Sequence, residues 1–182
     1  MSDVSFKDFD ILSEQDKAEA VALLQRYDQL EKQDGCQSDF ISFIKHMWPE
    51  FIEGRHHKII ADKFNKIADG KLKRLIVCLP PRHSKSEFAS TFFPAWMMGR
   101  RGNLKIIQTT HTAELAVRFG RKVRNIIDST EYQHIFPELK LQADNKSAGR
   151  WTSNQEGEFF AAGVGGAITG RGADLLIIDD PH

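Results

Sequence analysis

Two short, uninterrupted apolar runs limit the folds open to this chain more than any other feature of its sequence. Residues 75–79 read Leu-Ile-Val-Cys-Leu and precede two prolines, and residues 175–178 read Leu-Leu-Ile-Ile and precede Asp179 and Asp180. A strand of a parallel sheet is buried on both faces, so it reads as such a run rather than as an alternating pattern. Residues 104–110, which lie between these two runs, are another strand candidate. Amphipathic helical patterns follow residues 75–79 and residues 104–110. This alternation predicts an α/β protein with a parallel sheet.

The first part of the chain is predicted to be helical. Apolar residues at helical spacing, with capping residues at the ends, predict helices from Ser13 to Gly35, from Ser38 or Asp39 to Pro49, and from about His56 to Ala68. We therefore divide the chain into an N-terminal helical segment, residues 1–53, and a core, residues 54–182. Within the core, Pro94 is expected to kink or end the helix that follows the first apolar run.

The net charge of zero hides a strong asymmetry along the chain. Residues 1–53 carry 5 basic and 12 acidic side chains, residues 54–125 carry 16 and 4, and residues 126–182 carry 4 and 9. A basic middle segment of this kind is typical of proteins that handle polyanions, either a nucleotide or a nucleic acid. The alternative is that the acidic N-terminal region folds against the basic segment and neutralises it.

Several other classes of protein are not indicated. Met1–Ser5 lacks the basic start and apolar stretch of a signal peptide, and no apolar run approaches the roughly 20 residues of a membrane span. Cys36 and Cys78 lie far apart, so neither a disulfide framework nor a zinc site is supported, and Cys78 is expected to be a reduced core residue. We expect a soluble cytoplasmic protein that does not engage a membrane.

The turn after the first apolar run has the context of a phosphate-binding loop. The P-loop pattern G-x-x-x-x-G-K-[ST] lies between a buried strand and a helix, where backbone N–H groups and the helix N-terminus favour an anion. Lys85 and Ser86 match its last two positions, and they supply an ammonium for phosphate and a hydroxyl for Mg²⁺. Leu79 and Ser84 replace the two glycines. The alternative is a polar turn with one exposed lysine.

The acidic pair at the end of the last apolar run completes this hypothesis. In P-loop enzymes such a strand end holds Mg²⁺, so Asp179 would bind the metal and Asp180 would orient or deprotonate the attacking water. Ligands of open parallel sheets gather at the carboxyl ends of the strands, which would bring both motifs together. The alternative is a pair of solvated carboxylates. Arg82 is either an arginine finger supplied in cis or a surface arginine.

Two further features of the sequence leave alternatives open. Arg171 lies between two glycines and would contact nucleotide, DNA or a neighbouring subunit, or would serve no such role. His56 and His57 are adjacent on a predicted helix and therefore point in different directions, which favours packing or contact with a nucleotide base over a metal pair.

Four runs of this sequence resemble the large terminase subunit of tailed bacteriophages, the ATPase of the DNA-packaging motor. They are residues 54–64 (GRHHKIIADKF), 79–87 (LPPRHSKSE), 92–96 (FFPAW) and 163–181 (GVGGAITGRGADLLIIDDP). The second run is similar to that family's variant phosphate loop, commonly written PPRHGKSE, from which it departs at Ser84. The resemblance covers nearly the whole chain.

The resemblance implies a P-loop ATPase core of the additional-strand (ASCE), RecA-like type, a parallel sheet flanked by helices that binds ATP and Mg²⁺. The residues that match the phosphate loop are Pro81, Arg82, His83, Ser84, Lys85 and Ser86. Ser86 and Asp179 match the metal ligands, and Asp180 stands where many relatives carry the catalytic glutamate. Asp180 and Arg82 are therefore the predicted catalytic residues.

The same resemblance predicts a role in packaging double-stranded DNA into a procapsid, with the portal protein and the small terminase subunit as partners. Members of the family continue past the acidic strand with a further strand, a lid-like subdomain and a nuclease domain. We therefore expect a truncated core whose incomplete sheet leaves an apolar edge open to self-association, and whose hydrolysis is weak. The alternatives are a helicase-like P-loop ATPase and a non-catalytic, truncated binding module.

Overall fold

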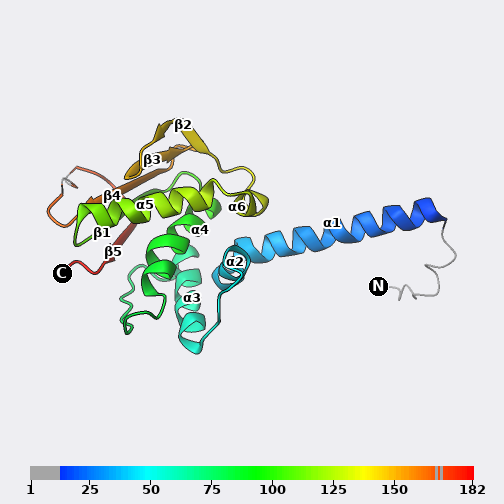
Figure 1. Ribbon diagram of the computed structural model, residues 1–182, viewed down its shortest axis with the longest axis horizontal. Helices are drawn as coiled ribbons and strands as arrows, with labels where there is room; N and C mark the ends of the chain where they lie inside the picture. The colour runs from blue at the N-terminus through cyan, green and yellow to red at the C-terminus, as the bar shows by residue number, and fades with distance from the viewer. Residues whose placement is uncertain (1–12, 167, 169) are drawn as a thin grey trace.

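The computed structural model describes residues 13–166, 168 and 170–182 of the chain. Met1–Ser5 and two residues of the glycine-rich run, Ala167 and Thr169, lie outside the described residues. The described chain is an α/β protein with an open, mixed, five-stranded sheet flanked by helices, and one long helix projects from the folded body (Figure 1). Within the described residues, no helix is both long and apolar enough to cross a membrane.

The helices and strands follow one another in an order that begins with helices and alternates later. The helices are α1 (Glu14–Ser38), α2 (Phe40–Met47), α3 (Arg55–Ala68), the π-helix η2 (Glu87–Phe92), α4 (Phe93–Arg100), α5 (Ala113–Ile127) and α6 (Thr130–Ile135). The strands are β1 (Lys105–Thr110), β2 (Leu141–Lys146), β3 (Arg150–Ser153), β4 (Glu158–Gly163) and β5 (Leu175–Asp179).

The predicted N-terminal helices are confirmed, with one difference in where the first one ends. Ser13 caps α1 by accepting a hydrogen bond from the Asp16 N–H, and Asp39 caps α2 by accepting one from the Ser42 N–H. However, α1 does not end at Gly35 but continues to Ser38. Its end is set by Asp39, whose extended backbone breaks the helix while its N–H still donates to the Gly35 carbonyl.

The sheet is mixed, so the prediction of a parallel sheet is only partly correct. The strand order is β2-β3-β4-β1-β5, and β1 pairs in parallel with both β4 and β5. β3 pairs antiparallel with β4 and with β2. The connection between β3 and β4 is only residues 154–157, which is long enough for a hairpin but too short for the crossover that a parallel pair requires. β2 lies in a stretch where no strand was predicted.

Residues 75–79 form no strand, contrary to the prediction. The segment is not paired with any strand, and its side chains alternate between partial burial and exposure. Leu75, Val77 and Leu79 pack against the core, whereas Ile76 is 89% exposed and Cys78 is exposed rather than buried. Burial on both faces requires a neighbour on either side within a sheet, and among the described residues this segment has neither.

β5 forms one edge of the sheet, and only one of its faces is covered. Ile177 and Asp179 are buried towards the helices, but Leu176 and Ile178 on the opposite face are 55% and 58% exposed. The last apolar run is therefore a strand, as predicted, but an edge strand rather than one buried on both faces.

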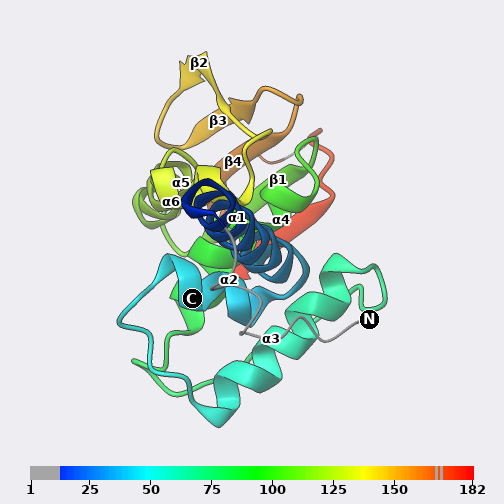
Figure 2. The ribbon, with the colours of Figure 1, turned by 90° about the vertical axis from the view of Figure 1, so that its right-hand side faces the viewer.

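Aromatic side chains dominate the core and join the helical region to the rest of the body. The ring of Phe40 in α2 lies 5.2 Å from that of Phe64, 5.6 Å from that of Phe88 and 5.4 Å from that of Trp96. The Trp96 indole N–H donates to the Cys36 carbonyl at 2.8 Å, which ties α4 to the end of α1. The hydrophobic core therefore includes residues on both sides of the division predicted at residue 53. Helix α2, before that residue, packs into the same interior as α3 and α4 (Figure 2).

The helix after the Pro80–Ser86 turn does not end at Pro94 but widens just before it. Residues 87–92 form a π-helix, and Pro94 then lies in the first turn of α4. A proline there cannot donate a backbone hydrogen bond, and its ring needs room beside the preceding turn. The wider turn provides this room, since single π-turns are a common way for a helix to absorb one extra residue.

The acidic helix α1 does not lie over the basic segment of the chain. It carries six acidic residues, Glu14, Asp16, Glu19, Asp28, Glu31 and Asp34, and most of its length extends away from the body (Figure 1). Within residues 1–53, Glu53 does pair with the basic segment, through Lys58 at 2.7 Å. Helix α1 therefore does not neutralise the basic segment by packing against it.

Candidate phosphate-binding site

The turn of residues 80–86 has the backbone conformation that glycine favours. Arg82 has a φ of 62° and Ser84 a φ of 60°. The left-handed conformation costs a residue with a side chain roughly 1–2 kcal/mol, so it persists where the surrounding structure imposes it. Ser84 holds the position of the second glycine in the P-loop pattern, and its backbone has the conformation that a glycine there would adopt without strain.

The ammonium group of Lys85 contacts the acidic end of β5. Lys85 Nζ lies 2.5 Å from Asp180 Oδ1, although the two residues are 95 positions apart in the sequence. The hydrogen bond to Asp180 raises the pKa of Lys85 above its ordinary value, since it favours the charged amine. Asp180 itself has a φ of 42°, so its backbone is no longer extended just after the end of β5. The fold therefore brings the two motifs together, although the segment before the turn is not a strand.

Asp179 is held in the interior by a serine of the π-helix. The Ser90 hydroxyl donates to Asp179 Oδ2 at 2.9 Å, and the two side chains are 0% and 7% exposed respectively. Burying a carboxylate without hydrogen-bond donors is costly, so this bond fixes both the position and the rotamer of Asp179. Ser86 lies four residues before Ser90 in the same helical run.

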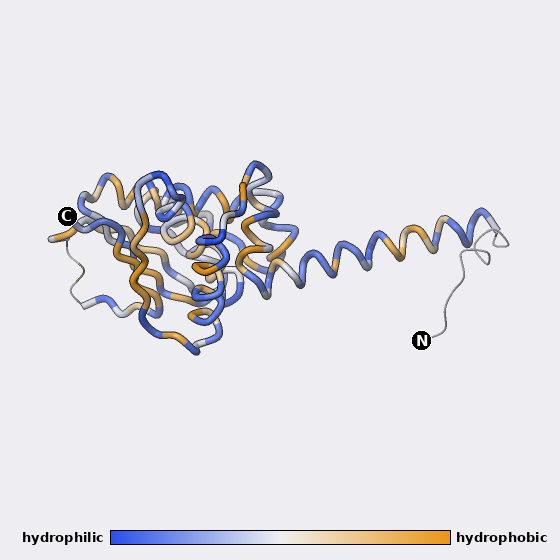
Figure 3. Tube along the Cα trace, turned by 90° about the horizontal axis from the view of Figure 1, so that it is seen from below, coloured by the Kyte–Doolittle hydropathy of each residue, from blue (hydrophilic) through white to orange (hydrophobic). Residues whose placement is uncertain are grey.

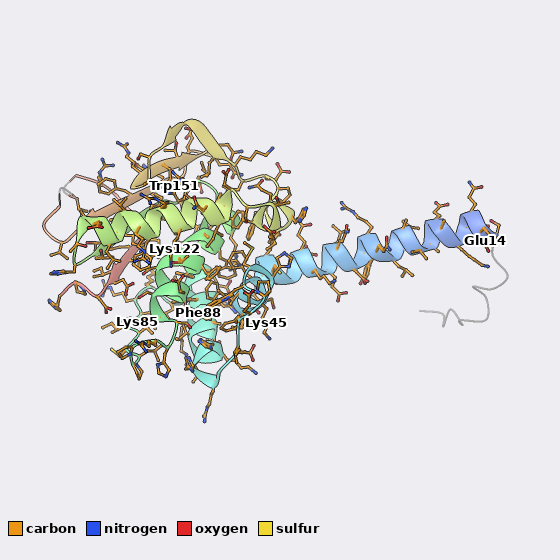
Figure 4. All side chains as sticks on the ribbon, viewed as in Figure 1. Glu14, Lys45, Lys85, Phe88, Lys122 and Trp151 are labelled. Carbon is orange, nitrogen blue, oxygen red and sulfur yellow. The ribbon has the colours of Figure 1, made fainter. Side chains whose placement is uncertain are left out.

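A second ion pair ties the start of η2 to the neighbouring helix. Glu87, the first residue of η2, pairs with Lys122 of α5. In Figure 4, Lys85 lies on the folded body, well away from Glu14, the first residue of α1. The candidate site is therefore supported by η2, α5 and the end of β5, and α1 is not part of it.

Other predicted site residues have different surroundings. Arg82 is exposed, and among the described residues its side chain has neither an ion-pair nor a hydrogen-bond partner. His83 Nδ1 lies 2.9 Å from the Pro81 carbonyl oxygen, a contact within the turn. Arg171 is directed elsewhere: it pairs with Glu158 at 3.0 Å and lies 4.0 Å from the centre of the Phe160 ring.

The rings of the adjacent histidines lie together, with centres 3.8 Å apart, contrary to the prediction that the two side chains point in different directions. His57 stacks on Phe88, and its Nδ1 accepts the Gly54 N–H at 2.9 Å, which caps α3. Burial, followed by the charge of neighbouring His56, lowers the pKa of His57. Among the described residues, no group of three or more His, Cys, Asp or Glu side chains is arranged to hold a metal ion.

The donor set at this end of the sheet suits a small, hard cation better than a transition metal. Mg²⁺ takes oxygen ligands and needs only one or two carboxylates, because water and phosphate oxygens complete its shell. Asp179 and Asp180 carry oxygens of that kind, and the Lys85 ammonium lies beside them. Sequence reasoning missed Ser90, whose only signal was a small polar residue inside a largely apolar helical run.

Comparisons with protein-family models, curated proteins and solved structures gave no match to this chain.

Proposed function

We propose that this chain binds ATP with Mg²⁺ between the 80–86 turn and the end of β5, as the ATPase portion of a motor that packages double-stranded DNA. The observation that carries the proposal is the contact between Lys85 and Asp180, which joins a turn of P-loop type to an acidic strand end. The terminase family, the P-loop fold of additional-strand type, and the partners DNA, portal protein and small subunit rest on the sequence resemblance alone.

Each residue of the site has a distinct role in this proposal. Lys85 leaves Asp180 for the β- and γ-phosphates, and the hydroxyl of Ser86 binds the metal together with Asp179. Bound Mg²⁺ neutralises charge on the phosphates. Asp180, once free of Lys85, orients the attacking water and accepts its proton, and Arg82 contributes positive charge beside the γ-phosphate.

Calorimetric titration with ATP and Mg²⁺ tests the binding step. We expect the wild-type chain to bind, and Lys85→Ala to weaken binding at least about tenfold, which corresponds to 1.4 kcal/mol. Lys71→Ala is the matched control, since Lys71 is also a lysine of the basic segment in a short ion pair, with Asp69 at 3.0 Å. A folded wild-type chain that binds no ATP, or equal binding by Lys85→Ala, would refute the proposal and favour a non-catalytic binding module.

Turnover is a separate measurement. We expect slow release of phosphate from ATP that depends on Mg²⁺ and disappears in Asp180→Asn, while ATP binding persists in that variant. Stimulation by double-stranded DNA rather than by single strands would favour a packaging motor over a helicase-like ATPase. Turnover that is unchanged in Asp180→Asn would assign the water-activating role to another residue.

A further inference from the structure

Gln108 is a fully buried amide in β1, a strand that is paired on both sides. Its side chain is 0% exposed, and among the described residues neither its Nε2 nor its Oε1 has a hydrogen-bond partner. Its paired neighbours, Ala161 and Ile177, have no polar side-chain atoms to offer. Figure 3 shows the stretches of apolar residues that run through the folded body. Burying an amide without hydrogen bonds is unfavourable for folding, so this residue calls for an explanation.

The pairing of β1 with β5 places Gln108 on the side of the sheet that holds Asp179. Gln108 pairs with Ile177, whose side chain packs in the core. Side chains two residues apart on a strand share a face, and Asp179 on this face bonds Ser90 of η2. Asp179 is thus the diagonal neighbour of Gln108, a separation that a long side chain can span. A change of side-chain rotamer is therefore enough to bring the Gln108 amide to the Asp179 carboxylate.

The hydroxyl groups nearest to Asp179 are already committed. Thr110 pairs directly with Asp179, but its hydroxyl donates to the Thr112 carbonyl at 2.7 Å. The Ser90 hydroxyl donates to Asp179 Oδ2 at 2.9 Å. A hydroxyl has one hydrogen to donate, whereas the amide of Gln108 has two. On this face of β1, the uncommitted donors of the described residues belong to Gln108.

We propose that Gln108 is a positioning residue for Asp179, and that its amide donates to the carboxylate when Asp179 binds Mg²⁺. This role rests on the proposed function, which gives the metal to Asp179. A carboxylate that binds a metal is itself held by hydrogen bonds from the side chains behind it, which fix its orientation. Ser90 supplies one such bond and Gln108 supplies another. The amide that has no partner in the ligand-free chain gains one when the metal binds.

This role has opposite consequences for stability and for metal-dependent binding. Met is an unbranched side chain of similar length that carries no amide, so Gln108→Met removes the unpartnered atoms without emptying the site. The ligand-free fold gains no hydrogen bond from the amide, so its removal should not destabilise the chain. The loss of a hydrogen-bond partner behind a metal ligand, in contrast, lowers metal affinity by roughly 10–100-fold.

Two measurements test the role of Gln108. Thermal unfolding without ligand should give Gln108→Met a Tm equal to or above that of the wild type. Calorimetric titration with ATP at a series of Mg²⁺ concentrations should show that the variant needs roughly 10–100-fold more Mg²⁺ for the same affinity. ATP titrated in EDTA should give the same result with both chains. Ile107→Met is the matched control, because it introduces the same residue at the next buried position of β1, on the opposite face.

The wild-type titration separates the role of Gln108 from the proposed function. A wild-type chain that binds no ATP refutes the proposed function, and the role of Gln108 with it. A wild-type chain that binds ATP, while Gln108→Met keeps the same dependence on Mg²⁺, refutes the role of Gln108 alone. A Tm that falls further in Gln108→Met than in Ile107→Met would mean that the amide is bonded within the ligand-free fold, and this would also overturn the proposal.

Discussion

The aromatic core and the candidate phosphate-binding site differ in how their residues are held. Around Phe40, which is 0% exposed, rings from α2, α3, η2 and α4 pack on all sides. At the site, Asp180 has a side chain that is 68% exposed and is held mainly by Lys85. The π-helix η2 belongs to both regions, because Phe88 packs in the core and Ser90 bonds Asp179. Stability and proposed chemistry are thus separated in space and connected through one short helix.

The largest effect is expected in the core. Phe40→Ala should lower the free energy of unfolding by about 3–5 kcal/mol, because it removes a ring that contacts several others and leaves a cavity. Urea unfolding measures this loss. Ile52→Ala is the control, since Ile52 is 87% exposed and its truncation should change stability by less than about 0.5 kcal/mol. Similar losses in both variants would contradict the contrast between core and surface.

Ser90→Ala tests the connection between the two regions. It leaves the buried Asp179 without a hydrogen-bond donor, so we expect a loss of about 1–3 kcal/mol in the free energy of unfolding. A double-mutant cycle with Asp179→Ala separates the contribution of the Ser90–Asp179 hydrogen bond from that of the packing of the Ser90 side chain. If the serine acts through the carboxylate, Ser90→Ala should cost much less in the Asp179→Ala background. Equal costs in both backgrounds would mean that Ser90 only fills space.

Ser84→Gly is expected to change ATP binding at the site while changing the stability of the fold only slightly. Glycine adopts a φ of 60° without strain but loses more backbone entropy on folding, so the net change in stability should stay within about 1 kcal/mol. On the proposed function, the variant should bind ATP more tightly, because the turn no longer needs to hold a strained residue. Unchanged ATP affinity would show that Ser84 does not weaken the loop.

The smallest effect concerns His57, which lies between the two regions. Because burial lowers its pKa in the folded chain, the unfolded chain binds this proton more readily. The neutral ring therefore stabilises the fold above about pH 6.5, the ordinary histidine pKa, and this stability is lost as the pH falls below that value. His57→Gln keeps an acceptor for the Gly54 N–H and should show a smaller drop in Tm between pH 7.5 and 5.5. His46→Gln, at an exposed position, should behave as the wild type does.

Local signals in the sequence predicted the helices well. Ser13 is a cap as predicted, and Asp39 is one of the two predicted candidates for the second helix. Such predictions succeed because a capping side chain acts on N–H groups two or three residues away and needs no distant partner. The last apolar run was also predicted to be a strand, and it is one because β1 pairs with it. The proximity of Lys85 and Asp180 was also predicted, but from the rule that strand ends gather at one edge of a sheet, and residues 75–79 before the turn form no strand.

What the sequence did not reveal depends on neighbours far along the chain. Residues 75–79 have strand-like composition, yet a strand exists only where another strand offers hydrogen bonds. The direction of β3 is set by the short 154–157 connection rather than by its composition. Arg171 is directed towards Glu158 and Phe160, which no local pattern indicated.

The π-helix changes the direction in which the side chains after it point. One additional residue in a turn rotates everything after it by about 100° relative to an uninterrupted α-helix. The residues up to Ser90 and those from Phe93 onward therefore follow two different helical phases. The first phase points Ser90 at Asp179, and the second points Trp96 at the Cys36 carbonyl. Deleting one residue between Glu87 and Phe92 would merge the phases, and the helix could then keep only one of these two hydrogen bonds.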